Sequence, residues 1–123
     1  MDLERLSCRM LGNPDYVGRA MEFIVAEDGR VLLDDAGIAH SREMQEQMFK
    51  AYFGAGYNIV YEPFEAWVSE SDDMGWALGL TKETKPNGAV EIGKYVSVWH
   101  RVDGVWKNVV EMRNYNGGVL VAR

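Results

Sequence analysis

The spacing of apolar residues changes once along this chain, near residue 57, and the change decides the class of fold. Before it, apolar side chains recur every three or four residues, which is typical of amphipathic helices. After it, apolar and polar residues alternate, which is typical of strands. The order predicts an α+β fold in which two to three N-terminal helices pack on a curved antiparallel sheet and form a cone with an internal pocket.

The helical part divides at residues that begin or end helices. Asp2 and Gly12 bound a first helix, and Asn13-Pro14 starts a second that Gly29 is expected to end. Ser41 is placed to cap a third. The expected core-facing stripes are Leu3, Leu6, Met10 and Leu11 in the first helix, Val17, Ala20, Met21 and Ile24 in the second, and Met44, Met48 and Tyr52, with Phe49 and Phe53 beside them, in the third.

Five strands are expected, one before the third helix and four after it. A short one covers residues 30–35, and the long ones cover 57–69, 75–84, 90–102 and 105–114. Pro63 predicts a bulge or an exposed edge in the strand that contains it, because proline cannot donate to a ladder. Asp103-Gly104 predicts a tight two-residue hairpin turn with positive φ.

Both faces of the predicted sheet are apolar. An antiparallel sheet that is covered by helices on one face normally exposes polar residues on the other. A second apolar face favours a homodimer that forms through the sheet. The two faces in the strand at 90–102 carry Ile92, Val96, Val98 and Val102 on one side and Tyr95 and Trp99 on the other.

Length and charge narrow the class of protein. The 123 residues fit one domain over residues 1–123. The formal net charge of −6, without a basic cluster, argues against nucleic acid or an anionic membrane as a partner. No apolar run approaches a membrane span and the first residues do not resemble a signal peptide, so we expect a cytoplasmic protein. Cys8, the single cysteine, is interpreted as a small buried side chain.

A family resemblance rests on three stretches. The segment from Gly93 to Lys107, with Tyr95, Asp103-Gly104 and Trp106, resembles the closing hairpin of the nuclear-transport-factor-2-like superfamily. More narrowly it is similar to SnoaL-like and ketosteroid-isomerase-like proteins. Residues 26–29 between helix and strand and residues 75–79 fit the same pattern. The resemblance implies a cone-shaped fold with a pocket between helices and sheet, and a dimer through the sheet.

The resemblance also implies candidate catalytic residues. The family's base falls near the end of the first strand, where a gapless match reaches Leu33, and Asp34 and Asp35 follow. The family's second acid falls at Val96, so that acid is missing here. The catalytic candidates are therefore Asp34, Asp35, His100 and Glu111.

The predicted pocket wall comes from three strands. His100 shares a strand face with Val96 and Val98, the face that the resemblance points inward. Glu111 and Arg113 lie on one face and either bind a polar ligand group or form a structural ion pair. The predicted lining residues are Trp76, Leu78, Leu80, Val96, Val98, Val109 and Arg113.

Two hypotheses for function remain. A non-catalytic protein would bind a small apolar or amphipathic molecule in a cavity with mostly apolar walls. An acid/base enzyme of isomerase, dehydratase or cyclase type would instead bring at least two of the polar candidates together in one cavity. We expect no metal site, because the two histidines, His40 and His100, have no ligand spacing, and we expect no cofactor.

Overall fold

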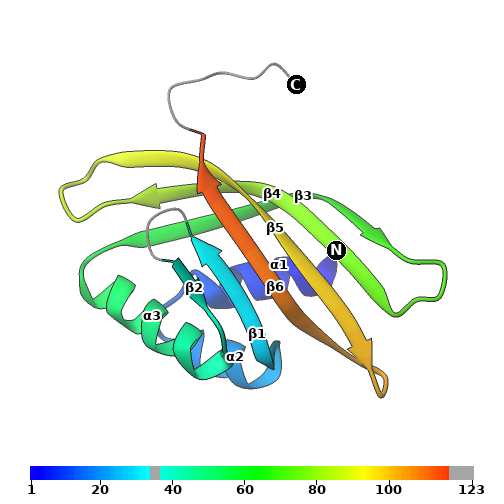
Figure 1. Ribbon diagram of the computed structural model, residues 1–123. Helices are drawn as coiled ribbons and strands as arrows, with labels where there is room; N and C mark the ends of the chain where they lie inside the picture. The colour runs from blue at the N-terminus through cyan, green and yellow to red at the C-terminus, as the bar shows by residue number, and fades with distance from the viewer. Residues whose placement is uncertain (34–36, 117–123) are drawn as a thin grey trace.

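The structure is a computed structural model that describes residues 1–33 and 37–116 (Figure 1). The described chain forms three helices and six strands: α1 (Asp2–Leu11), α2 (Val17–Phe23), β1 (Val25–Leu33), β2 (Gly37–Ala39), α3 (Arg42–Gly54), β3 (Asn58–Val68), β4 (Met74–Thr84), β5 (Val90–Val102) and β6 (Val105–Tyr115). The sheet order is β2-β1-β6-β5-β4-β3. Neighbouring strands are antiparallel except β1 and β6, which are parallel. The predicted α+β class is confirmed.

The helices cover one side of a long curved sheet (Figure 1). We call this side the inner face, and its central residues on β5 are the buried Tyr95, Ser97 and Trp99. Strand register places the next residues along each strand on the opposite side, the outer face. The outer face carries Trp67, Trp76, Leu78, Leu80, Val96, Val98, Val110 and Met112.

The buried stripes of α1 and α3 agree with the predicted ones only in part. In α1 the buried residues are Glu4, Ser7, Cys8 and Leu11, whereas Leu3 and Leu6 are exposed. These four still follow helical spacing, but two of them, Glu4 and Ser7, are polar, and Glu4 accepts hydrogen bonds from Ser97 and Trp99 inside the fold. In α3 the buried residues are Gln45 and Phe49, and the predicted Met48 and Tyr52 pack against the core as partly buried side chains, while Met44 is exposed.

The boundary between α2 and β1 also differs from the prediction. The helix ends at Phe23, and β1 already begins at Val25, so Gly29 lies inside a strand and does not end a helix. The pairing of β1 with β6 shifts register between Val25 and Arg30. A Cβ at Gly29 would lie 2.9 Å from Cγ1 of Val25, so this irregular segment needs a glycine.

Several local predictions are confirmed. The Ser41 hydroxyl accepts a hydrogen bond from the Met44 amide at 3.2 Å and caps α3. Strand β3 lies at the edge of the sheet, and its register shifts between Pro63 and Glu65. The turn between β5 and β6 has positive φ at Asp103 and Gly104.

Candidate functional site

A pocket of ≈ 220 Å³ opens beside the first turn of α1. Figure 1 shows the start of α1 at the same end of the sheet as the turn between β3 and β4. We call this cavity the α1 pocket. It is lined by Met1, Leu3, Glu4, Ala66, Trp67, Val68, Asp72, Gly75, Trp76, Ala77, Trp99 and Trp106.

Two inner-face tryptophans form part of the pocket wall. Trp99 is buried and belongs to the core, and the partly buried Trp106 packs against that core. A Cβ at Gly75 would lie 2.9 Å from the Trp67 carbonyl oxygen and 3.9 Å from the Trp106 ring. Glycine at this position therefore keeps the space next to Trp106 open.

A carboxylate reaches the pocket from the first turn of α1. Glu4 is only 5% exposed although it lines the cavity. Its Oε1 accepts hydrogen bonds from the Ser97 hydroxyl and from the indole nitrogen of Trp99, the latter at 3.0 Å. Its Oε2 accepts from the Cys8 thiol at 3.2 Å. Helix α1 and strand β5 thus hold this side chain in one orientation inside the fold.

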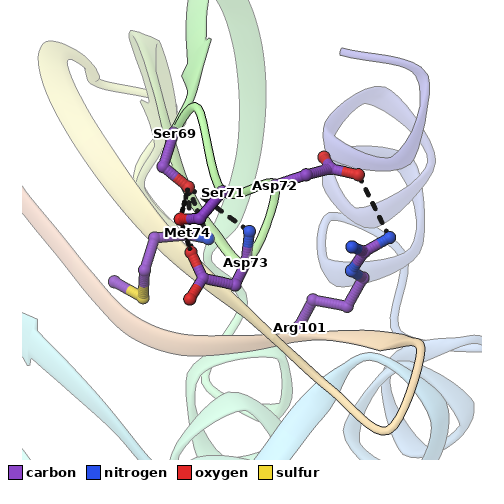
Figure 2. A network of polar contacts seen from close by, with 6 residues as sticks. All are labelled: Ser69, Ser71, Asp72, Asp73, Met74 and Arg101. Carbon is purple, nitrogen blue, oxygen red and sulfur yellow. Dashed lines mark hydrogen bonds and ion pairs between the residues drawn. The ribbon is translucent and has the colours of Figure 1, made fainter.

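Val68 and Asp72, at the turn between β3 and β4, line the pocket. Figure 2 shows the polar contacts of this turn. The hydroxyls of Ser69 and Ser71 donate to the Asp73 carboxylate at 3.0 and 2.6 Å. These hydrogen bonds, chiefly that from Ser71, lower the pKa of Asp73. Asp72 has a φ of 59° and forms an ion pair with Arg101 at 3.1 Å.

A second polar group lies deeper under the helices. Arg113 donates to the Tyr61 hydroxyl, which in turn donates to Oε2 of Glu111 at 3.3 Å. The Tyr61 ring meets the Tyr95 ring edge-on at 5.2 Å, and the Tyr95 hydroxyl lies 3.4 Å from the sulfur of Cys8. The polar interior therefore extends from Glu4 at the pocket to Arg113.

Burial dominates the titration of this interior. Burial raises the pKa of Glu111 to about 7; the Arg113 charge opposes this shift and the Glu4 charge adds to it. Burial also raises the pKa values of Tyr61 and Cys8, so both keep their protons at neutral pH. The buried interpretation of Cys8 is confirmed.

Arg113 is held by aromatic rings as well as by the Tyr61 hydroxyl. Its guanidinium lies 5.7 Å from the ring centre of Phe49, 5.4 Å from that of Tyr52 and 5.7 Å from that of Tyr61. Such contacts compensate a cation that burial has removed from water. Glu111 and Arg113 share the inner face as predicted, and they are connected through Tyr61.

The structure separates the other predicted site residues. His100 pairs across the sheet with Met74 and Lys107 on the outer face, away from Glu111. Asp34 and Asp35 lie outside the described residues. The outer face also carries four predicted lining residues, Leu78, Leu80, Val96 and Val98, so the predicted orientation of these strands is reversed. Val109 is the extra residue of a β-bulge. Trp76 lines the pocket, and its ring stacks on that of Trp67 with centroids 6.3 Å apart.

Sequence reasoning missed the carboxylate at the pocket. Glu4, Ser7, Cys8 and Leu11 have helical spacing, and this mixed stripe was the available signal. On β5 the missed residue is Ser97. It lies between the buried Tyr95 and Trp99, two positions from each, and therefore points to the same face of the sheet. Because both sheet faces are apolar, alternation alone could not tell which face points inward.

The remaining described residues offer weaker sites. No group of three or more His, Cys, Asp or Glu side chains within residues 1–33 and 37–116 has the arrangement of a metal site. A second pocket of ≈ 330 Å³ is lined by Pro14, Val17, Lys50, Phe53, Gly54 and Asn58. The charged side chain there, Lys50, is exposed and already forms an ion pair with Glu46 at 3.2 Å.

The chain is similar in fold to solved structures with a cystatin-like fold, among them nuclear-transport-factor-2-like proteins. A ketosteroid isomerase-like protein from Erwinia carotovora atroseptica has a TM-score of 0.79 at 15% identity, with 94% of this chain and 92% of that chain covered. A nuclear-transport-factor-2-like protein from Novosphingobium aromaticivorans has a TM-score of 0.72 at 16% identity, with 96% and 80% covered. A further such protein of unknown function, from Pseudomonas putida, has a TM-score of 0.74 at 14% identity, with 92% and 81% covered.

At these identities the likeness establishes the fold. No protein-family model and no curated protein matches the sequence. In the part of the chain that the structure describes, no helix has the length and apolar character needed to cross a lipid bilayer. The cytoplasmic location stays a prediction.

Proposed function

We propose that this chain is a small-molecule-binding protein of the ketosteroid-isomerase-like type, and that the α1 pocket holds its ligand. The observation that carries the proposal is a cavity with mostly apolar walls and one buried carboxylate, Glu4. Few polar groups in an apolar cavity are typical of sites for small organic molecules. The ligand class is a small apolar or amphipathic molecule.

Indole signals provide a direct test of the pocket. The chain has four tryptophans, and all of them line the α1 pocket. Titration with 2-phenylethanol, a neutral probe small enough for the cavity, should shift the indole N–H signals of Trp99 and Trp106 in ¹H–¹⁵N spectra. The substitution Trp106→Ala should weaken this binding about fivefold or more. Phe23→Ala, which removes an exposed ring at the end of α2, is the matched control and should leave the affinity within twofold. Absence of any shift at millimolar probe would refute the proposal.

Acid/base catalysis is the second candidate function. The observation that favours it is Glu111, because a buried carboxyl with a pKa of about 7 can take up or release a proton near neutral pH. The neighbouring Tyr61 hydroxyl and Arg113 would stabilise its charged form. His100, the predicted partner of Glu111, faces the other way, and Glu111 is not among the residues that line the α1 pocket.

A general probe of base catalysis tests this alternative. The heterocycle 5-nitrobenzisoxazole opens to a coloured phenolate when a base removes its ring proton. An enzyme that uses Glu111 should open the ring at a rate that rises through pH 7 and that falls at least tenfold in Glu111→Gln. Equal rates for both proteins would leave binding as the function.

We also propose that two copies associate through the outer face. Met112 and Trp67 on this face are 42% and 49% exposed, and Leu78, Val96 and Val98 lie between them across β4 and β5. A contiguous apolar surface of this kind favours a second apolar surface as its partner, and a second copy offers the same one.

The oligomeric state tests the association. Wild-type protein at micromolar concentration should sediment as a dimer. Leu78→Glu, which places a charge at the centre of the outer face, should give a monomer. Phe23→Glu introduces the same charge at an exposed ring on the helical side and should remain dimeric. A wild-type monomer at these concentrations would refute the association.

A further inference from the structure

The α1 pocket contains a negative charge that has no cationic partner among the described residues. Its charged lining side chains are Glu4 and Asp72, and the α-ammonium group of Met1, which also lines the pocket, does not lie within ion-pair distance of either. Asp72 is exposed and is neutralised by Arg101 at 3.1 Å. Glu4 is buried, and within residues 1–33 and 37–116 no lysine or arginine lies within ion-pair distance of its carboxylate. A buried carboxylate without a counter-charge is costly, so a positive charge is the partner that this pocket lacks.

The hydrogen bonds of Glu4 leave room for such a partner. Oε1 already accepts from two good donors, the Ser97 hydroxyl and the Trp99 indole. Oε2 accepts only from the Cys8 thiol among the described donors, and a thiol is a weak donor. A carboxylate oxygen can accept about two hydrogen bonds, so Oε2 can take a further, charge-assisted one.

The apolar walls suit the rest of a cationic ligand. Trp99 and Trp106 line the same cavity as Glu4. Tryptophan rings attract cations more strongly than other aromatic side chains do, and they also cover apolar surface. Trp106 already has a cation near its ring within this fold, since the Arg101 guanidinium lies 5.7 Å from its centre.

We propose that the α1 pocket selects a small organic ammonium ion, with the ammonium group bound to the Glu4 carboxylate and its apolar body against Trp99 and Trp106. This inference rests on the small-molecule function proposed above and adds the charge of the ligand. The second pocket, by contrast, has no carboxylate among its lining residues.

Three probes of nearly equal shape distinguish the effect of the ligand's charge on affinity from the effect of its size and apolar surface. They are 2-phenylethylamine, a cation at pH 7, the neutral 2-phenylethanol, and the anion phenylacetate. Dissociation constants are measured from the indole signals of Trp99 and Trp106. The amine should bind about tenfold more tightly than the alcohol, and phenylacetate should bind more weakly than both. Glu4→Gln should reduce the affinity for the amine about tenfold.

A matched variant controls for the loss of one charge. Asp2 lies on the same helix turn as Glu4, but its side chain is fully exposed and pairs only loosely with Arg5 at 3.6 Å. Asp2→Asn should therefore keep the preference of the amine over the alcohol within twofold. If Glu4→Gln does not fold, the ratio of the three dissociation constants in the wild-type protein decides the question.

The outcomes are distinct. Equal or tighter binding of the alcohol in the wild-type protein would overturn the ammonium inference and leave the pocket function standing. An amine preference that persists in Glu4→Gln would overturn the role of Glu4. If none of the three probes shifts Trp99 or Trp106, both this inference and the pocket function fail.

Discussion

The buried carboxyl of Glu111 makes the stability of this protein depend on pH in a defined direction. Burial raises its pKa from 4.5 to about 7 in the folded chain. Between these two values the folded state keeps the proton on Glu111, while the unfolded state releases it. The contribution of this group to stability is therefore largest at low pH and is lost as the pH rises toward 7.

The magnitude follows from the two pKa values. At ~1.36 kcal/mol per pH unit, linkage predicts that Glu111 lowers the free energy of unfolding by about 2–3 kcal/mol between pH 5 and pH 8. Glu111→Gln resembles the protonated form, because its amide oxygen can still accept from the Tyr61 hydroxyl. The variant lacks the titration, so the difference in stability between variant and wild type isolates the effect of this one group.

Urea denaturation at several pH values measures this difference. The free energy of unfolding of the variant minus that of wild type should be about 2–3 kcal/mol larger at pH 8 than at pH 5. Any constant cost of the amide cancels in this comparison. A difference that does not change with pH, or that changes in the opposite direction, would refute the assignment of a raised pKa to Glu111.

Three further substitutions test the packing of the fold by urea midpoints. Phe49→Ala removes a ring that is 1% exposed and should cost about 3–5 kcal/mol; a loss below about 1 kcal/mol would contradict its place in the core. Gly79→Ala should destabilise by more than about 1 kcal/mol, because the new Cβ would overlap the carbonyl oxygen of Glu62 at the β3 bulge, and an unchanged midpoint would speak against that close approach. Ser41→Ala should cost about 1 kcal/mol through loss of the bond from the Met44 amide, and a neutral result would count against the cap.

Much of the fold was predictable because local signals agree with it. The Ser41 cap and the Asp103-Gly104 turn depend on a few neighbouring residues, and both are present. Strand β5 has the predicted bounds for the same reason. The end of α2 was not predictable from Gly29, because a glycine ends helices and also permits strand bulges.

The candidate site was less predictable than the fold. The orientation of β5 depends on which apolar face the helices cover, and Val96 and Tyr95 are equally plausible core residues from alternation alone. Glu4 was hidden by its type, since an acidic residue in a first helical turn is usually solvated. Only the contacts with Ser97 and Trp99, more than ninety residues away in the chain, make its burial acceptable.

The central claim is that a small ligand occupies the α1 pocket beside Glu4. Intermolecular nuclear Overhauser effects between 2-phenylethylamine and isotope-labelled protein test this claim most directly. We expect contacts from the ring protons of the probe to the side chains of Leu3, Trp99 and Trp106, all of which line the cavity. Contacts confined to outer-face side chains such as Val96 and Met112, or no contacts at saturating probe, would contradict it.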